Sequence, residues 1–303
     1  MTRTCVILAL GVVLAPSMAA AQTPERPPAI AGCPTENLAW HACALQKAKV
    51  FTPPRTPSGT PDLQGYWRSR LTQSFSVEGV AASHRFARDP VQPWEVAPPE
   101  IIEPADRKIP YQPWAARIGR EGVNFREYVD PRSTCSTGGV PRLALQDPSQ
   151  ILQPPTDDHV LWLHEDHHQF RAIAMGQRPA VGRDVKTWNG LSRGRWEGNT
   201  LVIETANFNG YVWIDDSGNF YTDTARATER LTMVDRDTIH YQATIEDPTV
   251  YTRPWTVAWA LIRDTTPGGY ALFEESCREG DRNLPAIREQ GFRLYYGIPW
   301  RFR

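Results

Sequence analysis

The chain has 303 residues, of which 22% are charged and 41% hydrophobic, and this globular composition excludes a wholly disordered chain. The 33 basic and 34 acidic residues leave a formal net charge of −1. This balance gives no reason to expect a nucleic acid or an anionic membrane as a partner. The unusual counts are 11 tryptophans and 27 prolines, which favour sheets and aromatic pockets over helical bundles.

The first 21 residues have the pattern of a secretory signal peptide. Arg3 precedes an apolar stretch at 6–15 that is too short to span a bilayer, and Ala19, Ala20 and Ala21 form a small-residue cleavage site. No later stretch reaches the roughly 18 apolar residues of a transmembrane helix. We therefore expect cleavage after Ala21 and an exported chain, periplasmic or secreted, with no membrane span.

Four cysteines follow this segment, at positions 33, 43, 135 and 277. An even number in an oxidising compartment favours disulfides, and four cysteines allow three connectivities. We favour Cys33–Cys43, which closes a short local loop, together with Cys135–Cys277. The alternative is zinc or a free thiol, but the spacings match no zinc motif.

Residues 22–60 are rich in proline and threonine. Within them, the spacing of Leu38, Ala42 and Leu45 predicts a short helix over 36–49. The stretch 70–147 carries many prolines, which break any long element. A long irregular segment is typical of a covering loop, so we expect 70–147 to lie over one end of the domain as a lid or pocket wall.

From residue 148 onward, short runs rich in β-branched and aromatic residues alternate with turn signals, which predicts strands. The predicted strands are 65–67, 150–153, 159–164, 170–175, 193–196, 200–205, 227–234, 238–245, 255–263 and 270–276. Consecutive hairpins form an antiparallel meander, and closure into a barrel removes its edges. The expected fold is mainly β: an antiparallel up-and-down, lipocalin-like barrel at 61–290 with a proline-rich irregular insertion, followed by an aromatic and basic tail at 291–303.

Several motifs resemble a large family of exported bacterial proteins. The chain carries Pro-Asp-Leu-x-Gly-x-Trp at 61–67, and it carries Cys-x-Pro-x-Gly-x-Pro-Arg at 135–142 with Thr137 in place of the first proline. It also carries Trp-Asn-Gly-Leu-Ser-Arg-Gly-Arg-Trp-Glu-Gly-Asn-Thr-Leu-Val at 188–202. The resemblance covers residues 60–283 and implies no particular activity. The Gly-x-Trp strand at 65–67 also resembles the opening strand of lipocalins.

The segment 164–168 reads His-Glu-Asp-His-His and concentrates groups that exchange protons near neutral pH. We predict His164, Glu165 and His168 as catalytic acid–base residues, and the family resemblance implies that Glu165, His168 and Arg171 are retained. The preceding residues predict a strand entering a turn, so only one of His164 and Glu165 faces the barrel interior. The alternative is a solvated polar turn.

The same segment matches His-Glu-x-x-His, in which a helix presents two histidines to zinc and the glutamate activates water. On a strand, however, positions 164 and 168 stand about 13 Å apart, too far to bind one metal without a bend. A zinc metallopeptidase is therefore the third functional interpretation, and we predict neither a metal nor a cofactor.

Arginines and tryptophans on or beside the predicted strands are candidates for substrate binding. The predicted set is Arg142, Trp162, Arg171, Trp188, Arg193 and Trp196. Each arginine could instead form an ion pair with Glu229, Asp235 or Asp247, and most of the tryptophans could fill the core.

Two functions from different classes fit these residues. The first is an exported enzyme of lyase, isomerase or hydratase type, which uses His/carboxylate acid–base chemistry on a small hydrophobic or aromatic molecule in the barrel. The second is a lipocalin-like binding or carrier protein for such a ligand. A histidine hydrogen-bonded to a carboxylate favours the enzyme, whereas an apolar lining favours the carrier. The sequence does not indicate an oligomeric state.

Overall fold

The computed structural model describes residues 29–70, 76–79, 99–120, 124, 127–145, 148–176, 182, 184–275, 277 and 283–297. The predicted signal peptide at 1–21, part of the proline-rich stretch and positions 298–303 lie outside the described residues. None of the described helices is long and apolar enough to cross a membrane.

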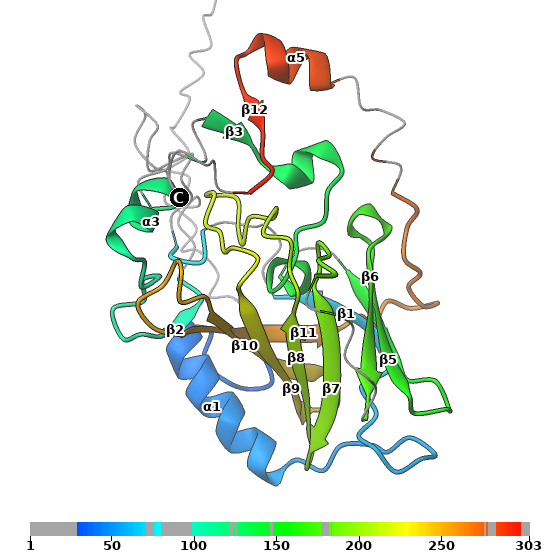
Figure 1. Ribbon diagram of the computed structural model, residues 1–303. Helices are drawn as coiled ribbons and strands as arrows, with labels where there is room; N and C mark the ends of the chain where they lie inside the picture. Colours follow the sequence, from blue (N-terminus) through cyan, green and yellow to red (C-terminus); the bar gives the residue numbers. More distant parts are fainter. Residues whose placement is uncertain are drawn as a thin grey trace, which may run out of the picture.

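The centre of the described chain is a closed β-barrel (Figure 1). In ring order its strands are β1 (Gly65–Ser69), β4 (Ser149–Leu152), β5 (His159–His164), β6 (Phe170–Met175), β7 (Leu191–Glu197), β8 (Thr200–Ala206), β9 (Arg226–Asp235), β10 (Thr238–Glu246) and β11 (Trp255–Arg263). The ring closes because β1 pairs with both β4 and β11. The predicted mainly β fold and its barrel are confirmed.

One pair of neighbours departs from the predicted antiparallel arrangement. Strands β6 and β7 run parallel, with Ala174 opposite Arg193, whereas the other neighbours in the ring are antiparallel. The reason is geometric: directions can alternate around a closed ring only if the number of strands is even, and this ring has an odd number. Residues 176–190 supply the longer connection that a parallel pair needs.

The predicted strand at 270–276 is wrong, because residues 270–275 have no regular structure. Strand β11 already pairs with β10 on one side and with β1 on the other, which leaves no free edge for a further barrel strand. Residues 264–275, termed the strap, instead run from the end of β11 past the turn between β5 and β6, to which they are hydrogen-bonded.

The longest helix among the described residues, α1 (Asn37–Val50), lies against the outside of the barrel over β9, β10 and β11 (Figure 1). Its first turn is capped by the side chain of Glu36, which accepts a hydrogen bond from the Ala39 N–H. Trp40 and Ala44 form its buried face. The predicted disulfide Cys33–Cys43 is confirmed, and it ties the preceding segment to this helix.

The described part of 70–147 contains more regular structure than its prolines predict. β2 (Ile101–Glu103) pairs with β11, and α3 (Pro113–Ile118), β3 (Tyr128–Val129), η2 (Pro131–Thr134) and η3 (Arg142–Ala144) follow. Near the C-terminus, α5 (Asn283–Glu289) precedes β12 (Arg293–Leu294), which pairs in parallel with β3. Figure 1 shows α3, β3, α5 and β12 beyond one end of the barrel.

One covering segment enters the barrel itself. Residues 139–145, termed the plug, place Val140 and Leu145 in the main hydrophobic core. Trp259 faces the same core, and its indole N–H donates to the carbonyl of Ala144 at 3.0 Å. The second predicted disulfide, Cys135–Cys277, is also confirmed and joins the chain just before the plug to the chain just beyond the strap. This end of the barrel is therefore filled by protein and held by a covalent link.

Candidate functional site

His164 lies at the end of β5 and faces the barrel interior. Val160, Trp162 and His164 are the buried residues of this alternating strand, and His164 is only 2% exposed. Its ring stacks on Trp162 with 5.2 Å between the ring centroids. Neither ring nitrogen makes a well-formed hydrogen bond to a described residue. The predicted strand and turn are confirmed, with His164 on the inner face and Glu165 off it.

An ion pair lies beside His164 in the interior. Arg171, opposite Trp162 on β6, donates to the two carboxylate oxygens of Glu229 at 2.9 and 2.5 Å. Both side chains are buried. Three hydroxyl groups complete the network. Those of Ser192 and Thr205 accept hydrogen bonds from Arg171, and that of Tyr241 donates one to Glu229. Arg171 is therefore engaged in an ion pair with Glu229, which is the alternative to a direct role in substrate binding.

The interior sets the protonation of its polar groups. Burial lowers the pKa of His164 to about 3, the charge of Arg171 acts in the same direction, and the Leu143 backbone of the plug opposes them. Burial and the Glu229 carboxylate raise the pKa of Tyr241 well above its usual value. Burial also raises the pKa of Tyr221, whose hydroxyl has no well-formed hydrogen bond among described residues. The histidine and both phenols are therefore neutral near neutral pH.

We refer to His164, Arg171, Tyr221, Glu229 and Tyr241 as the inner polar cluster. It can offer a ligand a neutral imidazole, a neutral phenol and the field of a paired guanidinium. Three of its members were absent from the predicted site: Glu229, Tyr221 and Tyr241. For Glu229 a signal existed, since it is the charged member of an otherwise apolar inward row on β9 at positions 227, 229, 231 and 233.

The structure does not bring the three predicted catalytic residues to one point. Glu165 accepts hydrogen bonds from the Tyr270 hydroxyl and, at 2.9 Å, from the Phe273 N–H, both in the strap. His168 is exposed, and its Nε2 accepts from the Glu275 N–H at 2.9 Å. These contacts fasten the strap to the β5–β6 turn.

The same turn lacks the helix that His-Glu-x-x-His requires for zinc binding. Asp166–His168 forms only a short 3-10 turn, η4, in which His167 has a positive φ of 51°. His164 is buried inside the barrel, whereas His168 is exposed at the surface. The two histidines of the motif are therefore not presented to one ion on a common helix face.

The remaining predicted substrate-binding residues are dispersed. Arg142 is buried among the covering segments, where it binds both carboxylate oxygens of Asp130 at 3.0 and 2.7 Å and also contacts Asp216. Trp188 stacks edge-on against Tyr211. On β7 the side chain of Ser192 points to Arg171 inside the barrel, so strand alternation places Arg193 on the outer face. Trp196 is partly buried against the main core. Of the predicted set, only Trp162 and Arg171 border His164.

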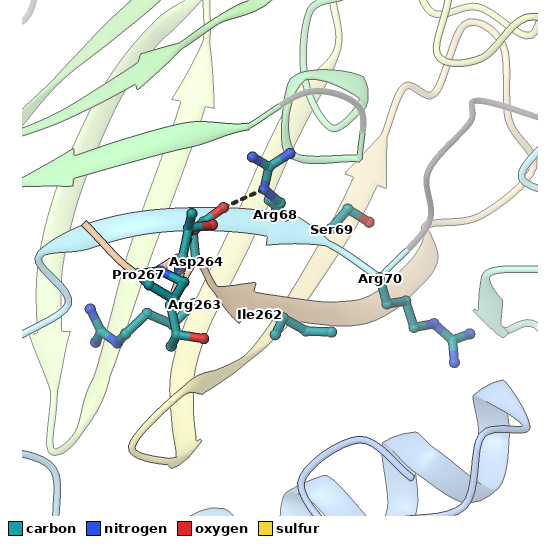
Figure 2. Close-up of a pocket in the computed structure, with 9 residues that line it drawn as sticks. Arg68, Ser69, Arg70, Ile262, Arg263, Asp264 and Pro267 are labelled. Carbon is teal, nitrogen blue, oxygen red and sulfur yellow. Dashed lines mark hydrogen bonds and ion pairs between the residues drawn. The ribbon is translucent and has the colours of Figure 1, made fainter. Parts of the chain in front are cut away.

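A surface depression of about 440 Å³ lies where β1 meets the end of β11 (Figure 2). Arg68, Arg70 and Arg263 line it, but Figure 2 shows their guanidinium groups pointing in different directions. Each donates to a protein group: Arg68 to Asp264 at 2.6 Å, Arg70 to the Thr35 carbonyl at 2.8 Å and Arg263 to the Gln64 carbonyl at 2.7 Å. These cations do not converge on a common point, so the depression offers no focused site for an anion.

No protein-family model, no curated protein and no solved structure matches the chain. The argument for function therefore rests on the chemistry of the site.

Proposed function

We propose that the protein is an exported enzyme that binds a small aromatic or hydrophobic molecule at the inner polar cluster and transfers a proton on it through His164. The observation that carries this proposal is a buried imidazole that makes no well-formed hydrogen bond to a described residue and has only the Leu143 backbone beside it. A buried polar group without a partner costs about 1–3 kcal/mol, and native structures contain few of them. A ligand oxygen beside His164 would remove this cost.

The residues of the inner polar cluster favour an uncharged ligand. Glu229 already neutralises Arg171, so the interior does not demand an anion. A neutral imidazole donates from one nitrogen and accepts at the other, which suits a hydroxyl or carbonyl group. Trp162 offers a flat apolar surface next to it. Phenols and aromatic aldehydes or ketones combine these features.

The inner polar cluster favours an enzyme over a carrier, although His164 itself is not hydrogen-bonded to a carboxylate among the described residues. Storage of an apolar molecule needs only apolar contacts, whereas burying an ion pair is costly and brings no affinity for such a ligand. Neutral His164 has a lone pair that can accept a proton, but burial and the charge of Arg171 disfavour the imidazolium, so His164 is a weaker base than a free imidazole and can hold the proton only transiently. This suits lyase, isomerase or hydratase chemistry, in which a proton is removed from one atom and returned to another. The paired cysteines are consistent with export to an oxidising compartment.

The test is proton exchange from solvent. The purified protein is incubated in D₂O with phenylacetone and related aryl ketones, and deuterium incorporation next to the carbonyl is followed by NMR. We expect exchange in the wild type and a loss of about 10²-fold or more in His164→Gln. His159→Gln, at the opposite end of the same strand, is the matched control and should exchange like the wild type.

Tryptophan fluorescence quenching in the same samples measures binding separately from exchange. Binding without exchange would identify the carrier function instead. Undiminished exchange in His164→Gln would refute the assignment of His164, and neither binding nor exchange with any phenol or aryl ketone would refute the ligand class.

A further inference from the structure

His167 points away from the inner polar cluster and meets acceptor groups on both sides of its ring. Its Nε2 lies 2.8 Å from the backbone oxygen of Arg132. Because a carbonyl can only accept, Nε2 carries a proton. The other nitrogen, Nδ1, lies 2.9 Å from Oε2 of Glu275 in the strap and 3.4 Å from Oδ1 of Asp166.

This arrangement favours a positive charge between the three groups, in addition to the Arg132 guanidinium, which has nitrogens 2.8 and 2.9 Å from Oδ1 of Asp166. If Nδ1 has no proton, its lone pair faces two carboxylates, and all three groups repel one another. A proton on Nδ1 can be donated to only one of the two carboxylates at a time, whereas a metal ion can be bound by the imidazole and both carboxylates together. The side chains of Asp166 and His167 are only 2% and 8% exposed, whereas that of Glu275 is 39% exposed, so the group is buried on the side of the turn and open to solvent on the side of the strap.

A second observation comes from the other carboxylate oxygen of Asp166. Oδ2 is buried and has no hydrogen-bond partner among the described residues. Oδ1 of the same group accepts from Arg132 Nε at 2.9 Å, which fixes the orientation of the carboxylate. A buried carboxylate oxygen without a donor is costly. The oxygen that lies 3.4 Å from Nδ1 is Oδ1, and a cation bound by both oxygens of this carboxylate would satisfy Oδ2 as well.

The distances match those between atoms bound to one ion. Zinc binds nitrogen and carboxylate oxygen at about 2.0–2.2 Å, which places neighbouring ligand atoms about 2.9–3.5 Å apart for octahedral or tetrahedral coordination. The two separations from Nδ1 fall in this range, and the ligand atoms of all three residues lie within 4.8 Å of one another. The hydrogen bond from Nε2 to a backbone carbonyl is the usual outer contact of a metal-binding histidine.

We propose that Asp166, His167 and Glu275 bind a divalent transition-metal ion, with Zn²⁺ as the preferred ion. An imidazole nitrogen with two carboxylates suits Zn²⁺ better than Mg²⁺ or Ca²⁺, which prefer sites made of oxygen. The ion joins the β5–β6 turn to the strap, next to the end of the barrel that holds His164. The ligands differ from those of the His-Glu-x-x-His motif, since His164 and His168 are not used.

The test is Zn²⁺ binding to the folded, EDTA-treated full chain, measured by isothermal titration calorimetry and metal analysis. We expect one Zn²⁺ per chain in the wild type. His167→Gln and Glu275→Gln should lower the affinity by more than the about 10–100-fold that loss of an outer contact costs. Co²⁺ serves as a second probe, because its visible absorption reports directly on nitrogen and oxygen ligands.

Two matched variants separate this site from other histidines. His159→Gln removes a histidine that lies 3.3 Å from the Asp158 carboxylate but outside the group, and it should bind Zn²⁺ like the wild type. His164→Gln should also bind normally, so the failure of the proposed acid–base function would not affect this result. Circular dichroism establishes that each variant is folded.

Two results would overturn the proposal. The first is a folded wild type that takes up no Zn²⁺ or Co²⁺, in which case a proton on Nδ1 is the charge between the groups. The second is unchanged Zn²⁺ binding in folded His167→Gln, which would place the ion elsewhere. Zn²⁺-dependent slowing of amide exchange at Phe273 and Glu275 in the wild type would support the predicted location in the strap.

Discussion

Replacing Glu229 with an apolar side chain should destabilise the protein strongly, because it leaves the Arg171 guanidinium charged inside the barrel. The side chains of Arg171 and Glu229 are 2% and 0% exposed. The carboxylate accepts two hydrogen bonds from Arg171 and one from Tyr241, and leucine can accept none. Breaking a buried pair from one side costs about 3–5 kcal/mol, and we expect Glu229→Leu to lower the free energy of unfolding by this amount.

The double variant Arg171→Met/Glu229→Leu should recover most of that loss, because removing both buried charges together is often nearly neutral. The hydroxyl groups of Ser192 and Thr205, which lose Arg171 as donor, already lie 3.0 Å apart and can bond to each other. Urea unfolding followed by tryptophan fluorescence, with the disulfides intact, gives the free energies for a double-mutant cycle. We expect a coupling free energy of about 3 kcal/mol or more.

The outer face of the barrel supplies a matched control pair. Arg195 and Glu204 are 2.7 Å apart but 49% and 58% exposed. The corresponding cycle, with Arg195→Met and Glu204→Leu, should give a coupling below about 1 kcal/mol. An equally small coupling for Arg171 and Glu229 would mean that water reaches this pair, and the dry interior on which the His164 argument depends would be refuted.

Three further stability measurements follow from buried titrating groups and from the disulfides. Folded His164 binds fewer protons than the unfolded chain between pH about 3 and 6.5, so stability is lost as the pH falls through this window, and His164→Gln should remove about 2.7 kcal/mol of that loss at pH 4.5. The pH dependence of stability that Glu100 contributes has the opposite sign. Burial raises the pKa of Glu100 to about 7, so stability is lost as the pH rises from about 4.5 to 7. Glu100→Gln should remove about 3 kcal/mol of this loss. A pH-independent difference between wild type and variant would contradict either assignment. Replacing Cys33 and Cys43 by alanine, which opens a loop with a sequence separation of 10, should lower the free energy of unfolding by about 2.7 kcal/mol. Replacing Cys135 and Cys277, with a separation of 142, should lower it by about 5 kcal/mol. The reverse order in urea unfolding would contradict the argument from loop entropy.

Much of the barrel was predictable because its information is local. Strands β5, β6 and β11 have the predicted bounds, and two-residue turns such as Gly198-Asn199 mark the hairpins directly. The parallel pair was not predictable from local pattern, since nothing in residues 176–190 distinguishes a crossover from a loose hairpin. The strap was mispredicted for a related reason: its residues suit a strand, but whether a strand forms depends on a free edge, and ring closure by β1 removes that edge.

The site shows the same division between local and distant information. Alternation along β5 predicts that His164 and Glu165 face opposite ways, and the structure places only His164 inside. The partner of Arg171 is a different matter, because β6 and β9 are not neighbours and their side chains meet only across the curved interior of the ring. Such a contact has no characteristic spacing in the sequence, but it can still be inferred from the sequence. Burying a lone carboxylate is prohibitively costly, so Glu229 in the apolar inward row of β9 requires a buried cation as its partner. Arg171 occupies an inward position on β6, so matching inward charges between strands, rather than reading each strand alone, is the step that would have brought this pair into the predicted site.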